Sequence, residues 1–271
     1  MADASGFQLT GTQPERYDTY AAPINTPFAT ALLDAVDLWP GAAVLDLACG
    51  TGFTARAAAA LVGPTGRVFG ADINEGMIRV ARARHPRLYP DIEFTVAPAD
   101  RLPYPDDTFD VVVCQQGAQF FPDLSAALAE TARVTRPGGR FAATVWAALD
   151  RQPYFRAQQH AIEEYGGPEA AERLAQAFAC TAERLTAALR EAGYRDTAHR
   201  EVGFGVALPP LDGFARNQLS GTPWGALVGE AGGEEALTRA GETVRERLAA
   251  HLAPDGTATV PFTAILVTAL R

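Results

Sequence analysis

The stretch Val44-Leu45-Asp46-Leu47-Ala48-Cys49-Gly50-Thr51-Gly52 decides the fold of this chain. Its apolar run, residues 44–47, is long enough for one buried parallel strand. Gly50 and Gly52 allow a sharp backbone turn and let a ligand approach without a Cβ in the way. The alanine-rich run 55–62 that follows predicts a helix. A strand, a glycine turn and a helix in this order are typical of a nucleotide-binding α/β unit.

Asp46 indicates which ligand this turn receives. A dinucleotide fold brings a pyrophosphate to the N-terminus of the helix, and a carboxylate at the end of the strand would repel that anion. The same carboxylate suits a ligand with a cationic amino acid end, such as S-adenosylmethionine, which carries an ammonium and a sulfonium. The alternative is that Asp46 only caps the helix or binds an amide of the turn.

Strands and helices alternate regularly up to about residue 150, which predicts a mostly parallel sheet with right-handed crossovers. A helix with Pro27 near its start is expected over 25–38, before the first strand. The turn Arg136-Pro137-Gly138-Gly139 is interpreted as structural, and the fifth strand is expected to begin after it. The expected strands are 44–47, 66–72, 92–97, 109–115 and 140–146, and the expected helices are 55–62, 75–84 and 124–134.

The pattern changes after residue 150, where helices are expected over 155–165, 170–178 and 181–192. Two long strands, 197–208 and 257–270, are expected to form an antiparallel hairpin at the sheet edge. The hairpin would complete a seven-stranded, Rossmann-like α/β sheet. The helical insertion between them, about 209–256, is long for a connector, and we interpret it as part of an acceptor-binding lid.

Three segments of one compact unit are therefore predicted. Residues 1–40 form an N-terminal helical cap, and residues 41–150 form the ligand-binding core. Residues 151–271 supply the rest of the sheet and the helical insertion.

The motif Leu45-Asp46-Leu47-Ala48-Cys49-Gly50-Thr51-Gly52 resembles the first motif of the class I S-adenosylmethionine-dependent methyltransferases. It is most similar to their small-molecule subgroup, which includes the ubiquinone/menaquinone-biosynthesis enzymes. The resemblance covers about residues 40–150 and is weak outside them. It implies S-adenosylmethionine as cofactor, S-adenosylhomocysteine as product, and methyl transfer by direct displacement.

Asp72 closes the second expected strand, twenty residues after Gly52. This spacing puts a carboxylate beside the cofactor ribose, whose two hydroxyls can donate to its two oxygens. The apolar side chains that follow would cover the adenine. The predicted cofactor residues in this part of the chain are Asp46, Ala48, Gly50, Gly52, Asp72, Ile73 and Met77.

The resemblance implies further cofactor contacts. After the third strand of the family, an acidic residue accepts the adenine amino group and the neighbouring backbone contacts the ring; Ala99, Asp100 and Arg101 stand at those positions. An N-cap or a surface ion pair is the alternative for Asp100. An N-terminal helix in the family covers the cofactor, so Tyr17 is a candidate contact, against simple packing of a surface helix.

Polar and aromatic residues follow the carboxyl end of the fourth strand, the edge at which open parallel sheets bind ligands. Gln115 is predicted to contact the cofactor, because an amide both donates and accepts hydrogen bonds. Gln119 and Phe120 are predicted to face the methyl acceptor, and Phe121 is interpreted as core.

Methyl transfer needs a base only when the acceptor must lose a proton that water does not take easily. Among four histidines, His160 is the candidate base, because it lies in the helix after the fifth strand; a structural role is the alternative. His85 lies in a surface-type segment. Cys49, Cys114 and Cys180 match no metal-ligand spacing and are interpreted as buried small residues, so no metal is expected.

The amino-acid composition of the chain restricts the class of substrate that it is expected to bind. The chain has 271 residues, 23 Lys and Arg against 32 Asp and Glu, and a net charge of −9, which argues against nucleic acid as substrate. It shows no signal peptide and no apolar run of about 20 residues, so a cytoplasmic protein without a membrane span is expected. A small-molecule acceptor is the expected partner, and a homodimer is one option for the oligomeric state.

Three functions stay open at this point. The first is methyl transfer to oxygen, nitrogen or carbon of a quinone, aromatic, polyketide or other secondary metabolite. The second is a non-methylating member of the fold, such as a cyclase or a subunit that only binds the cofactor. The third is a nicotinamide-dependent oxidoreductase, because Gly50, Gly52, Ala55 and Asp72 formally fit that fingerprint. Asp46 and the edge hairpin argue against this third function.

Overall fold

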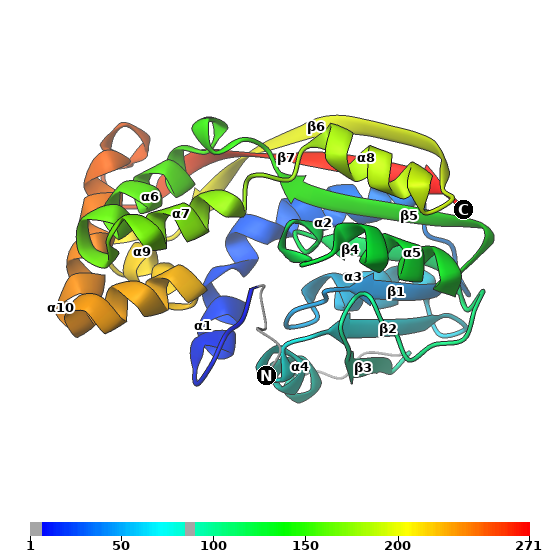
Figure 1. Cartoon of the computed structure of the whole chain (residues 1–271). Coiled ribbons are helices and arrows are strands. Elements are labelled where there is room, and N and C mark those ends of the chain that lie inside the picture. Colours follow the sequence, from blue (N-terminus) through cyan, green and yellow to red (C-terminus); the bar gives the residue numbers. More distant parts are fainter. Residues whose placement is uncertain (1–6, 85–89) are drawn as a thin grey trace.

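Seven strands form one sheet in the order β3-β2-β1-β4-β5-β7-β6 (Figure 1), within residues 7–84 and 90–271, which the computed structural model describes. Neighbouring strands from β3 to β5 are parallel, whereas β7 is antiparallel to both β5 and β6. This order confirms the predicted Rossmann-like sheet with an antiparallel edge hairpin. The strands are β1 (Ala43–Leu47), β2 (Arg67–Asp72), β3 (Ile92–Val96), β4 (Phe109–Gln115), β5 (Thr135–Trp146), β6 (Arg195–Leu208) and β7 (Ala258–Leu270).

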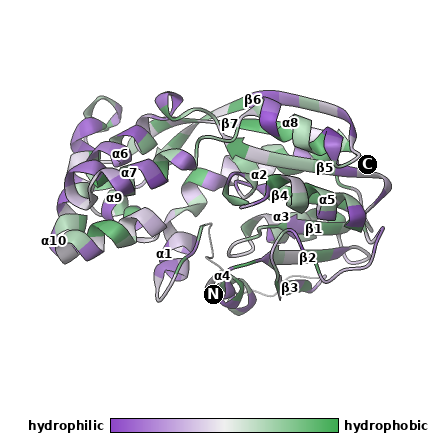
Figure 2. Cartoon of the chain, viewed as in Figure 1, coloured by the Kyte–Doolittle hydropathy of each residue, from purple (hydrophilic) through white to green (hydrophobic). Residues whose placement is uncertain are grey.

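The central strand β1 is buried along its whole length, as expected of a parallel strand with helices on both faces. Val44 belongs to a cluster that includes residues of α2 and α3, whereas Leu45 and Leu47 belong to a cluster that includes residues of α5 and α8. Successive side chains of β1 thus point to opposite faces of the sheet and pack into two different cores. Figure 2 shows the apolar residues concentrated on the central strands. The helices that flank the sheet are α2 (Ala22–Val36), α3 (Phe53–Val62), α4 (Glu75–Ala83), α5 (Leu124–Val134) and α8 (Ala182–Glu191).

A group of helices from the second half of the chain gathers at one end of the sheet, where Figure 1 also shows α1 (Gln13–Tyr20) close by. We call α6, α7, α9 and α10 the helical cap, which is distinct from the N-terminal helical cap predicted for residues 1–40. The cap packs on a third core, which includes residues of the β6–β7 hairpin. Gly232 and Gly233 have non-helical backbone angles and kink α10. The remaining bounds are α6 (Pro153–Gly166), α7 (Pro168–Gln176), α9 (Leu211–Ser220), α10 (Pro223–Arg247), η1 (Ala118–Phe120), η2 (Leu149–Arg151) and η3 (Ala249–His251).

Two element boundaries differ from the sequence prediction by three residues or more. α2 begins at Ala22, so Pro23 stands in its first turn and Pro27 lies inside the helix. β5 begins at Thr135, before the Arg-Pro-Gly-Gly segment that was expected to precede it. The reason is pairing with the chain end, since the Gly138 N–H donates to the Arg271 carbonyl and the Arg271 N–H to that of Gly139, both at 2.9 Å.

None of the helices in the described part of the chain is long and apolar enough to cross a membrane. The division into three segments stays a prediction.

Candidate functional site

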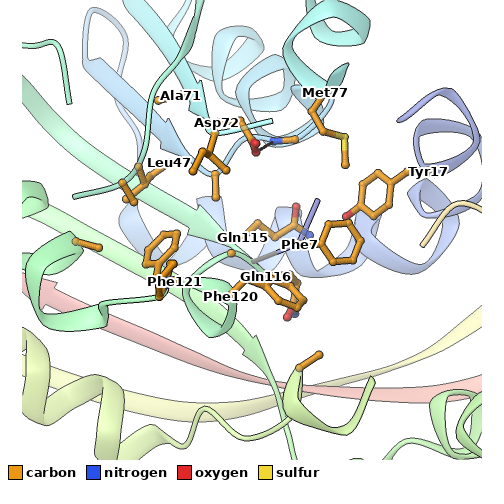
Figure 3. Close-up of a pocket in the computed structure, with 18 of the residues that line it drawn as sticks. Phe7, Tyr17, Leu47, Ala71, Asp72, Met77, Gln115, Gln116, Phe120 and Phe121 are labelled. Atoms are coloured by element: carbon orange, nitrogen blue, oxygen red, sulfur yellow. Dashed lines mark hydrogen bonds between the residues drawn. The ribbon is translucent and has the colours of Figure 1, made fainter. Parts of the chain in front are cut away.

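A cavity of about 480 Å³ lies at the carboxyl-end edge of the parallel strands (Figure 3). The parallel pairing of Leu47 with Ala71 brings the glycine turn after β1 and the end of β2 to this edge. Residues of the N-terminal segment and the helical cap close the other sides. A volume of this size is typical of small-molecule sites. A second, smaller pocket of about 40 Å³ adjoins it and shares six lining residues with it: Tyr17, Ala21, Asn25, Ala48, Gly50 and Gln115.

The turn after β1 bends through three residues with positive φ, namely Ala48, Gly50 and Gly52. Gly50 lines both pockets, and a Cβ there would lie 4.0 Å from the Tyr17 ring. Gly52 lines neither pocket. A Cβ on Gly52 would come within 2.6 Å of the Phe94 ring, so its role is to let α3 and β3 pack closely.

Asp72 stands at the end of β2 and lines the large cavity. Its Oδ2 accepts a hydrogen bond from the Gly50 N–H, and its Oδ1 accepts one from the Asn74 N–H, both at 2.8 Å. These bonds fix the carboxylate at the cavity wall. Burial nevertheless raises its pKa. Each carboxylate oxygen has a second lone pair, which a ligand hydroxyl can use.

Asp46 is 1% exposed and lines only the smaller pocket. Its Oδ2 accepts a hydrogen bond from the Ala55 N–H at 2.8 Å, whereas its Oδ1 is buried without a partner among the described residues. Burial raises the pKa of this carboxyl to about 8, against the lowering effect of the Ala55 amide. Asp46 therefore does bind an amide of the helix start, and it still has one buried oxygen that a cationic ligand group would satisfy.

The loop after β3 brings Ala99, Asp100 and Arg101 to the large cavity. Asp100 and Arg101 are exposed at its rim. Ile73 and Met77 line the same cavity from the β2–α4 side. Ile73 is 45% exposed, which is unusual for an isoleucine and leaves an apolar surface for a ligand to cover.

Gln115 and Phe120 line the cavity from the end of β4 and the turn after it, but Gln119 does not. Gln115 accepts a hydrogen bond from the Thr54 hydroxyl at 2.6 Å and donates to the Asn25 carbonyl at 2.9 Å. Gln119 instead donates to Oε1 of its neighbour Gln116. Phe121, interpreted as core, also lines the cavity.

Tyr17 of α1 reaches both pockets, beside Phe7 (Figure 3). The two ring centroids are 5.7 Å apart in an edge-to-face arrangement. Within the described residues, the Tyr17 hydroxyl accepts a single long hydrogen bond, from Asn25 at 3.4 Å. Burial raises the pKa of the phenol to about 12, so Tyr17 keeps its proton at neutral pH.

His160 is not brought to the cavity. It lies on α6, but its side chain is exposed and lines neither pocket. The three cysteines are buried and free, as expected of small core residues. Across residues 7–84 and 90–271, no group of three or more His, Cys, Asp and Glu side chains is placed to hold a metal ion.

Sequence reasoning missed the aromatic side of the cavity. Most of these residues come from the N-terminal segment and from the cap or its connections, and Trp146 comes from the end of β5. In sequence the apolar ones look like ordinary core positions. The signal available was that apolar residues occur in these segments, and it did not distinguish positions that line the cavity from other apolar positions. The missed lining residues are Phe7, Ile24, Trp146, Phe155, Phe178, Gln218, Thr222 and Trp224.

The charges around the two pockets restrict the ligand. Asp18, Asp46, Asp72, Asp100 and Asp123 line them, and Arg101 is the one cationic residue among the described lining residues. A pyrophosphate would meet carboxylates at the glycine turn. Arg56 donates to the Thr51 carbonyl of this turn and lowers the pKa of Asp46, but it lines neither pocket. The site instead fits a ligand with hydroxyls for Asp72 and a cationic group near Asp46.

Comparisons with known proteins agree with this geometry. Residues 44–139 match the family described as methyltransferase domain. Over 103 residues the chain is 46% identical to the ubiquinone/menaquinone biosynthesis C-methyltransferase UbiE of Hydrogenovibrio crunogenus, which is 37% of this chain and 41% of that protein. The chain thus spans less than half the length of this relative.

Solved structures resemble the chain over nearly its whole length. Phosphoethanolamine N-methyltransferase 2 of Haemonchus contortus, in complex with phosphomonomethylethanolamine and S-adenosylhomocysteine, has a TM-score of 0.61 at 16% identity, covering 97% of this chain and 58% of that one. The cyclase SpnF has a TM-score of 0.57 at 20% identity, covering 98% of both chains. At such identities these likenesses show the fold alone.

Proposed function

We propose that this chain, whose residues 44–139 match a methyltransferase domain, transfers a methyl group from S-adenosylmethionine to a small-molecule acceptor. One observation supports the proposal most. The buried carboxyl group of Asp46 and the half-buried one of Asp72 flank a glycine turn, and no cationic side chain lines the smaller pocket among the described residues. This charge distribution suits a cofactor with a ribose diol and a cationic amino acid end.

The adenosine part is assigned to the wall formed by β2 and the loop after β3. Asp72 would accept hydrogen bonds from the ribose hydroxyls, because its carboxylate is already held in place by two backbone amides. Ile73 and Met77 would cover the adenine, and Asp100 would accept from its amino group. Backbone of Ala99 and Arg101 would border the ring.

The methionine part is assigned to the smaller pocket. Gly50 lets the ligand approach the backbone, and the unpartnered Oδ1 of Asp46 provides the negative charge that an ammonium needs. Gln115 and Tyr17 line this pocket and the large cavity, so they would border the junction between the two parts of the cofactor.

The chain's own residues would bind, orient and shield the reactants. When bound, S-adenosylmethionine supplies an electrophilic methyl group, so alignment of the acceptor is the main task of the protein. Aromatic side chains on the cap side line the cavity and would exclude water from the bound reactants. Tyr17 would stay protonated there and would act as a wall, not as a base.

The acceptor proposed is a small molecule methylated on oxygen, nitrogen or carbon, of the quinone, aromatic, polyketide or other secondary-metabolite kind. The support is the aromatic lining contributed by Phe7, Phe120, Phe155, Phe178 and Trp224. Flat apolar molecules bury well against such side chains.

The experiment is to incubate the full chain with methyl-labelled S-adenosylmethionine and a metabolite extract of its host, and to search for labelled products by mass spectrometry. The Asp72→Asn variant is the control, because it keeps the shape of the side chain and removes its charge. A labelled small molecule formed by the wild type and strongly reduced in the variant supports the proposal.

The other outcomes separate the alternatives. Cofactor binding without labelled product in any extract contradicts methyl transfer and favours a non-methylating protein of this fold. Failure to bind S-adenosylmethionine, together with binding of a nicotinamide dinucleotide, contradicts the proposal as a whole and favours the oxidoreductase.

A further inference from the structure

The large cavity extends beyond the residues assigned to the cofactor, toward the helical cap. We call this part the acceptor region and define it by Phe7, Phe120, Phe155, Phe178, Gln218 and Trp224. Aromatic contacts connect its walls. The Phe7 ring centroid lies 5.0 Å from that of Phe120 and 5.6 Å from that of Trp224, and those of Phe155 and Phe178 are 5.2 Å apart.

No residue of the acceptor region carries a charge. The charged side chains among the described lining residues of the large cavity are Asp72, Asp100, Arg101 and Asp123. The first three belong to the cofactor wall. Asp123 is exposed and caps α5, because its Oδ1 accepts a hydrogen bond from the Ala126 N–H at 2.9 Å. A charged acceptor would therefore lose its hydration without meeting an opposite charge.

Among the residues that define the acceptor region, Gln218 carries the side-chain amide. Two buried residues that hydrogen-bond to it set the orientation of this amide. Its Oε1 accepts hydrogen bonds from Nε2 of Gln158 and from the Tyr154 hydroxyl, the latter at 3.4 Å. Tyr154 and Gln158 are both 0% exposed. In this orientation Oε1 of Gln158 is buried without a partner among the described residues. With both amides reversed, the Tyr154 hydroxyl proton as well as the Gln158 amine would be buried without partners, so the observed orientation leaves one buried group fewer unpaired.

This network leaves Nε2 of Gln218 as the group that is free for a ligand. It has no hydrogen-bond partner among the described residues, and the side chain lines the cavity. Nε1 of Trp224, in the same region, is also buried and has no partner in the described part of the chain. Both groups are N–H donors, so the acceptor region offers donors to a ligand and no charge.

We propose that Gln218 determines acceptor specificity, by donating a hydrogen bond from Nε2 to an oxygen of an uncharged, flat apolar acceptor. Tyr154 and Gln158 are positioning residues that hold the Gln218 amide in the donating orientation. The proposal rests on the proposed function, because that function is what assigns this part of the cavity to the methyl acceptor. The binding preference itself is measurable without turnover.

The test uses four naphthalenes of similar size as probes: 2-acetylnaphthalene, 2-methylnaphthalene, 2-naphthoate and 2-naphthylmethylammonium. Binding to the full chain is measured by calorimetry, with and without saturating S-adenosylhomocysteine. The ketone is expected to bind at least tenfold more tightly than either charged probe, and severalfold more tightly than the methyl compound. Equal or tighter binding of a charged probe overturns the proposal, as does failure of all four probes to bind.

Variants assign the preference to Gln218. Gln218→Leu is expected to abolish the advantage of the ketone over the methyl compound, and Gln218→Glu to make the ammonium probe the tightest of the four. Gln176→Leu, at an exposed position of α7 that does not line the cavity, is the matched control and should keep the wild-type preference. A ketone advantage that survives in Gln218→Leu overturns the proposal.

Tyr154→Phe tests the positioning role. The ratio of ketone to methyl affinity is expected to fall, while the affinity for S-adenosylhomocysteine stays at the wild-type value. A purely structural role would weaken all probes together and leave this ratio unchanged. If the wild type does not bind S-adenosylhomocysteine, the proposed function is contradicted. If it binds S-adenosylhomocysteine but the four probe affinities do not follow the expected order, only the role of Gln218 is contradicted.

Discussion

Asp46 and Ala55 are joined across the glycine turn by a 2.8 Å hydrogen bond from the Ala55 N–H to Oδ2 of the carboxyl group. The other oxygen, Oδ1, is buried without a partner among the described residues. A single amide does not offset the burial of the charge, and the pKa of Asp46 is raised to about 8. The free protein is thus expected to hold a proton on Asp46 at neutral pH.

Binding of the cofactor is therefore expected to release a proton. A cationic ligand group favours ionised Asp46, so affinity for S-adenosylmethionine should rise from pH 6 to 8 and level off above the pKa of about 8. Calorimetry at pH 7 in buffers of different ionisation enthalpy measures the release, which should approach one proton. Asp46→Asn should show none. Equal heats in all buffers for the wild type would contradict this reading.

The same carboxyl group should make the unliganded protein less stable as pH rises. Its folded pKa of about 8 exceeds the ordinary value of 3.8, so ionisation disfavours the folded state between these two pH values. Asp46→Asn keeps an oxygen for the Ala55 amide and removes the ionisation. The melting temperature of the variant minus that of the wild type should therefore increase from pH 5 to pH 8. A difference that stays constant over this range would count against the raised pKa.

Gly52→Ala should destabilise the fold by about 2 to 5 kcal/mol. This range is the sum of two costs, that of an alanine in the left-handed conformation and that of overpacking. The backbone φ of Gly52 is +77°, and an added Cβ would come within 2.6 Å of the Phe94 ring. Denaturant unfolding measures the loss. Gly213→Ala is the control, since Gly213 lies in a helix with open space around it and the change should be neutral or stabilising. Similar stabilities for the two variants would refute the close packing.

Tyr17 should matter through its ring and not through its hydroxyl. In residues 7–84 and 90–271 its hydroxyl has one hydrogen bond, the 3.4 Å contact with Asn25, whereas its ring packs on Phe7 and the residue lines both pockets. Tyr17→Phe should lower affinity for S-adenosylhomocysteine by less than about tenfold, the value of one weak neutral hydrogen bond. Tyr17→Ala should lower it further. A large effect of Tyr17→Phe in the titration would assign the hydroxyl a direct role.

The sheet and the cofactor wall could be predicted because their signals are local. A buried strand, a glycine turn and an acid at the end of the next strand each lie within a few residues. Asp72 and Gln115 reach the cavity for that reason. The acceptor region could not be predicted, because Phe7 and Trp224 are more than two hundred residues apart and meet only in the folded chain.

His160 illustrates a signal that was present and not used. It lies two residues from both Gln158 and Ile162, which are buried. Two residues correspond to about 200° around a helix, so His160 had to lie on the opposite face of α6. The periodicity of the helix could therefore have excluded it from the cavity.

The most direct test of the central claim is a calorimetric titration of S-adenosylhomocysteine into the wild-type chain and into Asp72→Asn. We expect one site per chain, and an affinity about 10- to 100-fold lower in the variant, the loss typical of hydrogen bonds to a charged group. His160→Ala, away from both pockets, should bind like the wild type. No binding to the wild type, or equal affinities for wild type and Asp72→Asn, would contradict a cofactor held at this turn.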